Sequence, residues 1–145
     1  MRIEVATAQQ LFDLGISLSA QLKAGDLILI NGPLGAGKTV LAQGIGKGLG
    51  IDDITSPTFV ISRTHKGVLP MIHVDAYRLI DTENPSLYLD DLDLDIENSV
   101  TVIEWGGAES ARLSEGRLEI TIDRAHEIRQ VEIKAIGARW DGFEI

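Results

Sequence analysis

The chain has 145 residues, of which 44% are hydrophobic and 24% charged, as in an ordinary globular protein. We expect a single domain over residues 1–145. The absence of cysteine excludes disulfides, thiolate nucleophiles and cysteine-based zinc sites. No signal-peptide pattern and no apolar run of membrane-spanning length occur, so we expect a cytoplasmic protein without membrane partners.

Charge argues against nucleic acid as a direct partner. Thirteen Lys and Arg stand against 22 Asp and Glu, which gives a net charge of −9. The cations form no cluster in the sequence, and such a chain is repelled by a phosphate backbone. We therefore expect no strong direct binding of nucleic acid.

The first long periodic stretch runs from Thr7 to Lys23. Leucines recur there at three- and four-residue spacing, which predicts an amphipathic helix that Ala24-Gly25 end. Thr7 is the expected N-cap. The next residues, Leu27 to Ile30, are all apolar and predict a strand that is covered on both faces.

A phosphate-binding motif follows that strand. Residues 32–39 read Gly-Pro-Leu-Gly-Ala-Gly-Lys-Thr, the G-x-x-x-x-G-K-[ST] pattern in its strand–loop–helix setting. Glycines let backbone N–H groups surround a phosphate, Lys38 reaches the β- and γ-phosphates, and the Thr39 hydroxyl can coordinate Mg²⁺. The predicted nucleotide contacts are Gly32, Pro33, Leu34, Gly35, Ala36, Gly37, Lys38, Thr39 and Val40. Thr7, the expected N-cap, has contact with the nucleotide base as a second candidate role. The sequence therefore predicts that a nucleoside triphosphate and Mg²⁺ bind here.

The residues after the loop predict a helix with a buried stripe at Leu41, Ile45 and Leu49, ended by Gly50. Gly44, Gly46 and Gly48 lie within it, and close packing against the sheet is a possible reason for them. The remaining predicted elements are strands over Phe59–His65 and Val68–Val74, a helix over Glu83–Leu89, a strand over Val100–Ile103, a short helix over Ala108–Leu113, and a hairpin of Leu118–Ile122 with Val131–Ala135. Together they predict an α/β, P-loop NTPase-like three-layer fold, with helices on both faces of a mixed, mainly parallel sheet.

Three polar residues near predicted strands are candidates for the nucleotide site. Thr58 lies in a loop where a hydroxyl can sense Mg²⁺ or the γ-phosphate. Asp75 ends a strand and can hold Mg²⁺ through water. Glu104 ends the next strand and can bind Mg²⁺ or orient the attacking water. The neighbouring His73 and Trp105 suit either packing or function equally well.

The motif by itself leaves several protein classes open. A GTPase is excluded, because the chain has no Asp-x-x-Gly and no Asn-Lys-x-Asp motif. A small-molecule P-loop kinase stays open, with the Arg112–Arg117 region as a weak version of its arginine-bearing lid. A binding module that takes up nucleotide without turnover also stays open.

Four stretches together, Gly32–Thr39, Ser56–Phe59, His73–Arg78 and Ile103–Trp105, resemble the TsaE (YjeE) family. The resemblance implies a weak, Mg²⁺-dependent ATPase needed for N6-threonylcarbamoyladenosine on tRNA, with the TsaB–TsaD transferase complex as its partner. It also implies that Lys38, Asp75, Glu104 and Thr58 are catalytic, and that Thr39, Glu104 and Asp75 bind Mg²⁺. By the same resemblance Arg129, which opens the last strand, lies close to the nucleotide.

Two departures from the family pattern stand in the chain. Glu104-Trp105 is followed by Gly106-Gly107, where members commonly have Pro-Glu, so a role for a second carboxylate in that loop does not carry over. Ala76 stands where leucine is frequent, a change that concerns packing.

Overall fold

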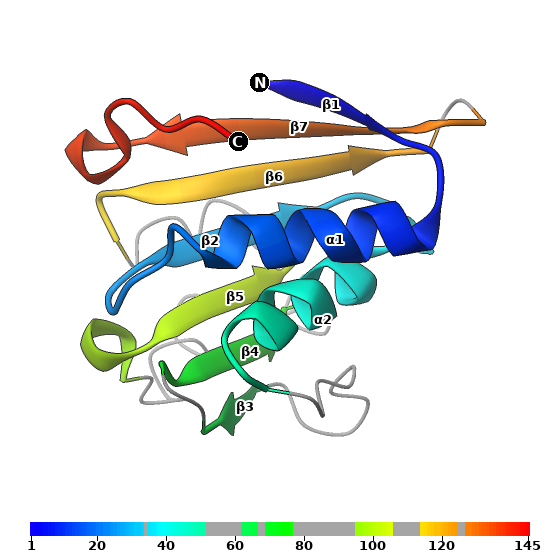
Figure 1. The fold of residues 1–145 in the computed structure, drawn as a ribbon. Helices are drawn as coiled ribbons and strands as arrows, with labels where there is room; N and C mark the ends of the chain where they lie inside the picture. Colours follow the sequence, from blue (N-terminus) through cyan, green and yellow to red (C-terminus); the bar gives the residue numbers. More distant parts are fainter. Residues whose placement is uncertain (34, 52–61, 67–68, 77–94, 106–113, 125–126) are drawn as a thin grey trace, which may run out of the picture.

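The computed structural model describes residues 1–33, 35–51, 62–66, 69–76, 95–105, 114–124 and 127–145. Within them one sheet has the strand order β1-β7-β6-β2-β5-β4-β3 (Figure 1). The strands are β1 (Arg2–Val5), β2 (Leu27–Asn31), β3 (Ser62–His65), β4 (Met71–Asp75), β5 (Val100–Glu104), β6 (Arg117–Asp123) and β7 (Arg129–Ile136). The helices are α1 (Ala8–Ser19) and α2 (Lys38–Gly48), with short 3₁₀ turns η2 (Ile96–Asn98) and η3 (Ala138–Trp140).

Parallel pairing occupies the centre of the sheet. β2 pairs in parallel with both β5 and β6, and β4 pairs in parallel with β5. The outer pairings β1–β7, β6–β7 and β3–β4 are antiparallel. The predicted α/β class, the mixed sheet and the predicted hairpin, β6 with β7, are confirmed. β1 was not predicted, although Ile3 and Val5 alternate there with charged residues, which is the pattern of an edge strand.

Two cores lie on opposite faces of the sheet. Ile28 and Ile30 of β2 join the larger core beneath the helices, whereas Leu27 and Leu29 join a smaller one on the other face. β2 is therefore buried on both faces, as its unbroken apolar run predicts. The helices predicted over 83–89 and 108–113, which were expected to complete the three layers, lie outside the described residues.

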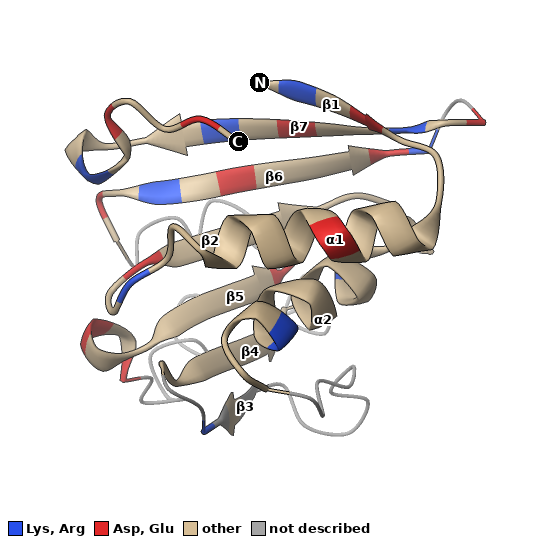
Figure 2. Cartoon of the chain, in the orientation of Figure 1, with Lys and Arg blue, Asp and Glu red and all other residues tan. Residues whose placement is uncertain are grey.

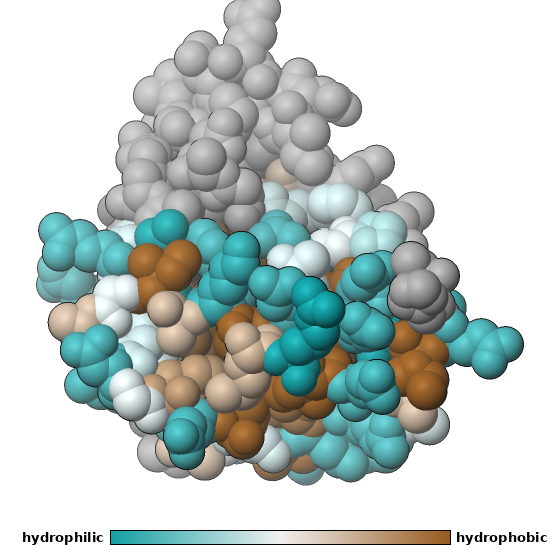
Figure 3. Space-filling view, turned by 90° about the horizontal axis from the view of Figure 1, so that it is seen from above, coloured by the Kyte–Doolittle hydropathy of each residue, from teal (hydrophilic) through white to brown (hydrophobic). Residues whose placement is uncertain are grey.

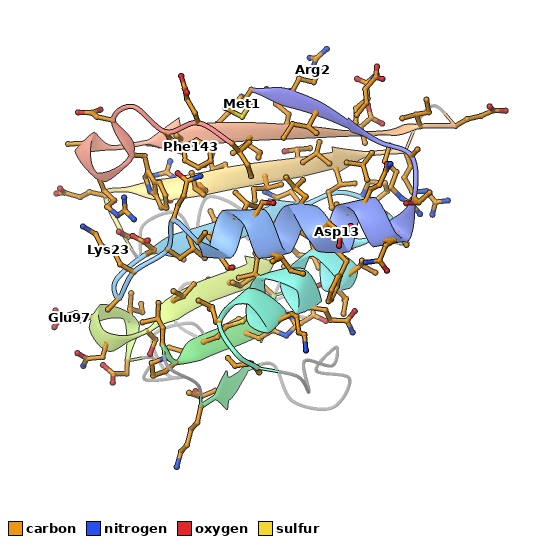
Figure 4. The ribbon with its side chains drawn as sticks, in the orientation of Figure 1. Met1, Arg2, Asp13, Lys23, Glu97 and Phe143 are labelled. Carbon is orange, nitrogen blue, oxygen red and sulfur yellow. The ribbon has the colours of Figure 1, made fainter. Side chains whose placement is uncertain are left out.

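Helices α1 and α2 lie side by side on one face of the sheet (Figure 1). Thr7 caps α1, because its hydroxyl accepts a hydrogen bond from the N–H of Gln10 at 3.1 Å. The helix ends at Ser19, earlier than predicted, since the N–H groups of Gln21 and Leu22 bond to carbonyls three residues back and tighten the chain. Asp13 lies on its outer face (Figure 4).

The glycines of α2 serve a different contact from the one expected. A Cβ on Gly44 would strike the carbonyl oxygen of Phe12, and a Cβ on Gly48 would strike the side chain of Ser19. From the other helix, a Cβ on Gly15 would lie 2.6 Å from the carbonyl oxygen of Leu41. The expectation that these glycines pack against the sheet is therefore wrong for Gly44 and Gly48: they let α1 and α2 meet backbone to backbone.

Charged residues of both signs are spread over the described elements (Figure 2), in keeping with the dispersed cations of the sequence. Seen from the side of β1, hydrophilic and apolar residues are mixed on the described surface (Figure 3). Neither α1 nor α2, nor any other described helix, has the length and apolarity that crossing a bilayer requires.

Candidate nucleotide-binding site

The loop of residues 32–37 leaves β2 at the edge of the sheet where the parallel strands β2, β4, β5 and β6 end. Ligands of open α/β sheets bind at this edge. Gly37 precedes α2 with a left-handed φ of 110°, and a Cβ there would lie 2.5 Å from Cδ2 of Leu11. A Cβ on Gly32 would lie 2.6 Å from the carbonyl oxygen of Ile122. Glycine is thus needed where the loop passes α1 and β6.

The loop is braced by hydrogen bonds of its own. The N–H of Ala36 donates to the carbonyl of Pro33 at 3.0 Å. Helix α2 begins immediately afterwards, at Lys38, so its first N–H groups and the positive end of its dipole lie at the loop. Such a helix start attracts anions, phosphate among them.

The Lys38 side chain lies across the start of the loop. Its ammonium donates to the carbonyls of Gly32 and Pro33, at 2.8 Å each, and lies 3.8 Å from the centre of the Trp105 ring. Burial lowers the pKa of Lys38, and the negative charges of Glu104 and Asp75 act in the opposite direction. Trp105 therefore packs against the candidate site, one of the two roles that its sequence position allowed.

Two of the predicted Mg²⁺ ligands are in direct contact. The hydroxyl of Thr39 donates to Oε1 of Glu104 at 3.0 Å, which joins the first turn of α2 to the end of β5. Asp75 is the register partner of Glu104 on the adjacent parallel strand, about 4.8 Å away along the sheet. The structure thus brings Thr39, Glu104 and Asp75 to one edge.

The second oxygen of Glu104 is also engaged. Nε2 of His73 lies 2.5 Å from Oε2 of Glu104, and both side chains are buried. Sequence reasoning left the role of His73 open. Its position two residues before Asp75 is the only sequence signal for this contact, because alternate residues of a strand share a face.

Two arginines have to be distinguished at this edge. Arg129 begins β7 and pairs in register with Val5, and its Nε is buried without a hydrogen-bond partner among the described residues. Arg124, which was not predicted, donates from Nη1 to the carbonyl of Gly35 at 2.5 Å. The sequence feature that could have indicated this contact is the position of Arg124 directly after β6, the strand that pairs in parallel with β2.

The structure does not test the other predicted nucleotide contacts. Thr58 and Leu34 lie outside the described residues. The Thr7 hydroxyl is engaged as the cap of α1, and its contact with a nucleotide base stays a prediction. Val40 lies partly buried in the first turn of α2.

The donor set fits Mg²⁺. In the described part of the chain, no group of three or more His, Asp or Glu side chains forms a metal site from protein alone. Magnesium in phosphate-transfer sites does not require one, because it binds one or two carboxylates and takes its other ligands from phosphates and water. A hydroxyl and two carboxylates beside a phosphate-binding loop supply the hard oxygen atoms that this ion prefers.

A glycine-rich loop between a buried parallel strand and a helix, with a lysine and a hydroxyl at the helix start, defines the P-loop class of nucleotide-binding folds. Comparisons with known proteins narrow the class. The family model described as threonylcarbamoyl adenosine biosynthesis protein TsaE matches residues 5–131. The chain belongs to the TsaE family.

Individual relatives agree with that assignment. A Streptomyces coelicolor protein is 45% identical over 139 residues, covering 88% of this chain and 92% of the relative. A Bacillus subtilis protein is 39% identical over 126 residues, covering 85% and 78%. Both are named tRNA threonylcarbamoyladenosine biosynthesis protein TsaE. The crystal structure of Bacillus subtilis YdiB superposes with a TM-score of 0.77 at 29% identity, covering 97% of this chain and 88% of that one.

Proposed function

We propose that this protein binds ATP with Mg²⁺ at the Lys38 loop, hydrolyses it slowly, and acts as an accessory factor in forming N6-threonylcarbamoyladenosine on tRNA. The observation that carries the proposal is the hydrogen bond from Thr39 to Glu104. It pairs the hydroxyl of the loop motif with a carboxylate at a strand end, and this pair holds Mg²⁺ in P-loop NTPases.

Each residue has a part in the proposed reaction. Lys38 binds the phosphates after exchanging its contacts with the loop carbonyls of Gly32 and Pro33. The Thr39 hydroxyl donates a hydrogen bond to Glu104, which leaves the lone pairs of the Thr39 oxygen free for the ion. Asp75, beside Glu104, binds through water or orients the attacking water. Mg²⁺, when bound, would neutralise charge that develops on the phosphates.

The proposed partner is the TsaB–TsaD transferase complex, which would carry out the group transfer itself. The names of the relatives support a place in this pathway, and the net charge of −9 favours a protein partner over direct contact with tRNA. Thr58 remains a proposed sensor of Mg²⁺ or the γ-phosphate, and Arg129 a proposed contact of the nucleotide.

The kinase alternative loses part of its support. Arg117, at one end of the weak lid candidate, begins β6 at the edge of the sheet opposite the loop. There it is bonded to Glu119 at 3.0 Å. Residues 112 and 113 of that candidate lie outside the described residues.

The decisive variant is Glu104→Ala. We expect it to bind ATP but to lose at least 100-fold in hydrolysis, because an electrostatic contribution of this kind is worth that much. Glu132→Ala, which removes an exposed carboxylate on β7, is the control and should hydrolyse ATP at the wild-type rate.

Reconstitution gives the wider test. Wild-type protein with ATP should raise the number of modification turnovers by the transferase complex on tRNA, and Glu104→Ala should not. Efficient phosphoryl transfer to a metabolite would replace the proposal with the kinase. Nucleotide binding with no hydrolysis under any condition would replace it with a binding module.

A further inference from the structure

The buried histidine of β4 has no part in the function proposed so far. His73 is fully buried, so its side chain does not contact a nucleotide bound at the protein surface. It lies on the same face of β4 as Asp75, because alternate residues share a face. This face turns toward the helices, since Met71, two residues before His73, belongs to the core beneath them.

Both carboxylate oxygens of Glu104 have a partner. Oε1 accepts from the hydroxyl of Thr39 at 3.0 Å, and Oε2 lies 2.5 Å from Nε2 of His73. One contact would still let the carboxylate rotate about its terminal torsion, which is broad and soft. Two contacts on opposite oxygens fix that torsion. His73 and Thr39 together therefore determine how Glu104 is presented.

The position of the proton on His73 follows from its other nitrogen. Nδ1 is buried and has no hydrogen-bond partner among the described residues. A proton there would leave a buried donor unsatisfied and would point the lone pair of Nε2 at a carboxylate. The proton is therefore assigned to Nε2, which donates to Glu104.

We propose that His73 is a positioning residue of the magnesium site: its Nε2–H holds Oε2 of Glu104, so that Oε1 stays on the hydroxyl of Thr39. The proposal rests on the function proposed above. If the contact is lost, the carboxylate turns, the Thr39 hydroxyl loses its acceptor, and its lone pairs no longer face the ion. Hydrogen-bond partners of this kind typically change metal affinity by about 10- to 100-fold.

The test compares ATP affinity with and without Mg²⁺, read from Trp105 fluorescence or by calorimetry, so that activity is not needed. His73→Leu removes the donor at similar volume, and we expect the gain in affinity from Mg²⁺ to fall at least tenfold. His73→Gln keeps an N–H at the place of Nε2 and should restore most of it. His73→Asn has a shorter reach and should behave like His73→Leu.

Thr101→Val is the matched control. Thr101 is fully buried on β5, and its hydroxyl has no hydrogen-bond partner among the described residues. It faces the other side of the sheet, like its alternate neighbour Ile103 in the smaller core. This variant should leave the Mg²⁺ effect unchanged, which separates loss of a buried polar group from loss of the Glu104 contact.

A measurement on wild-type protein tests the proposal even if the His73 variants fail to fold. Nitrogen-15 spectra of wild-type protein should show that the Nε2 of His73, one of the three histidines, carries a proton and donates it in a hydrogen bond. An Nε2 of His73 that carries no proton, or an unchanged Mg²⁺ effect in folded His73→Leu, would overturn the positioning role alone. Wild-type protein that binds no ATP would overturn the proposed function as well.

Discussion

Oγ1 of Thr39 lies 3.0 Å from Oε1 of Glu104, although 65 residues separate the two in sequence. The contact joins a loop-and-helix start to the end of a neighbouring strand, and it unites the two halves of the candidate site. Because Thr39 donates the hydrogen bond, its oxygen keeps both lone pairs available for a cation.

If Thr39 and Glu104 act as a unit, their substitutions should not add. Thr39→Val and Glu104→Ala should each reduce ATP hydrolysis at saturating Mg²⁺ and ATP by at least about 100-fold, and the double variant should be little worse than either single one. Thr39→Ser keeps the hydroxyl and should remain within a few-fold of wild type. Losses that multiply in the double variant would show that the two residues act independently.

Lys38 should make stability depend on pH at alkaline values. Its pKa in the folded protein lies below the ordinary 10.5 because the ammonium is buried. As the pH approaches 10.5 the unfolded chain therefore binds more protons than the folded one, so the contribution of Lys38 to the free energy of unfolding rises with pH.

The comparison that isolates Lys38 is with Lys38→Met. The free energy of unfolding of wild type minus that of Lys38→Met, from urea titrations, should increase as the pH is raised. Lys134→Met, which removes an exposed lysine of β7, should run parallel to wild type at every pH. A constant difference for Lys38→Met would mean that the folded protein leaves this pKa unchanged.

Arg124 should strengthen nucleotide binding by holding the loop. It donates to the carbonyl of Gly35, so Arg124→Ala frees the loop apex, and we expect the dissociation constant for ATP to rise about fivefold. Arg2→Ala, which removes an exposed arginine paired with Glu132, is the control and should leave this dissociation constant unchanged. Calorimetry measures the dissociation constant for each variant. Equal affinities for wild type and Arg124→Ala would assign the contact to surface packing only.

Gly44→Ala should destabilise the protein even though alanine favours helices by about 1 kcal/mol over glycine. The added Cβ meets the carbonyl of Phe12, so α1 and α2 must separate at a net cost of about 1–3 kcal/mol. Urea unfolding measures this, with Ser17→Ala on the exposed face of α1 expected to stay within about 0.5 kcal/mol. Stabilisation by Gly44→Ala would contradict the close helix contact.

Several features were determined by the sequence alone because they are local. The loop motif is contiguous, Thr7 caps a helix that begins at the next residue, and the apolar run of β2 predicts burial on both faces. Each depends on neighbours within a few residues, where propensity and spacing carry the information. The family resemblance rests on the same contiguous stretches.

Only the tertiary structure decided which of these parts meet. The sheet places β2 beside β5 and β6 rather than beside its chain neighbours, and this order brings Glu104 to Thr39 and Arg124 to Gly35. The register of β4 against β5 sets His73 beside Glu104. Strand order and register arise from packing of the whole core, and a one-residue slip would turn every side chain to the other face, so no local pattern could specify these contacts.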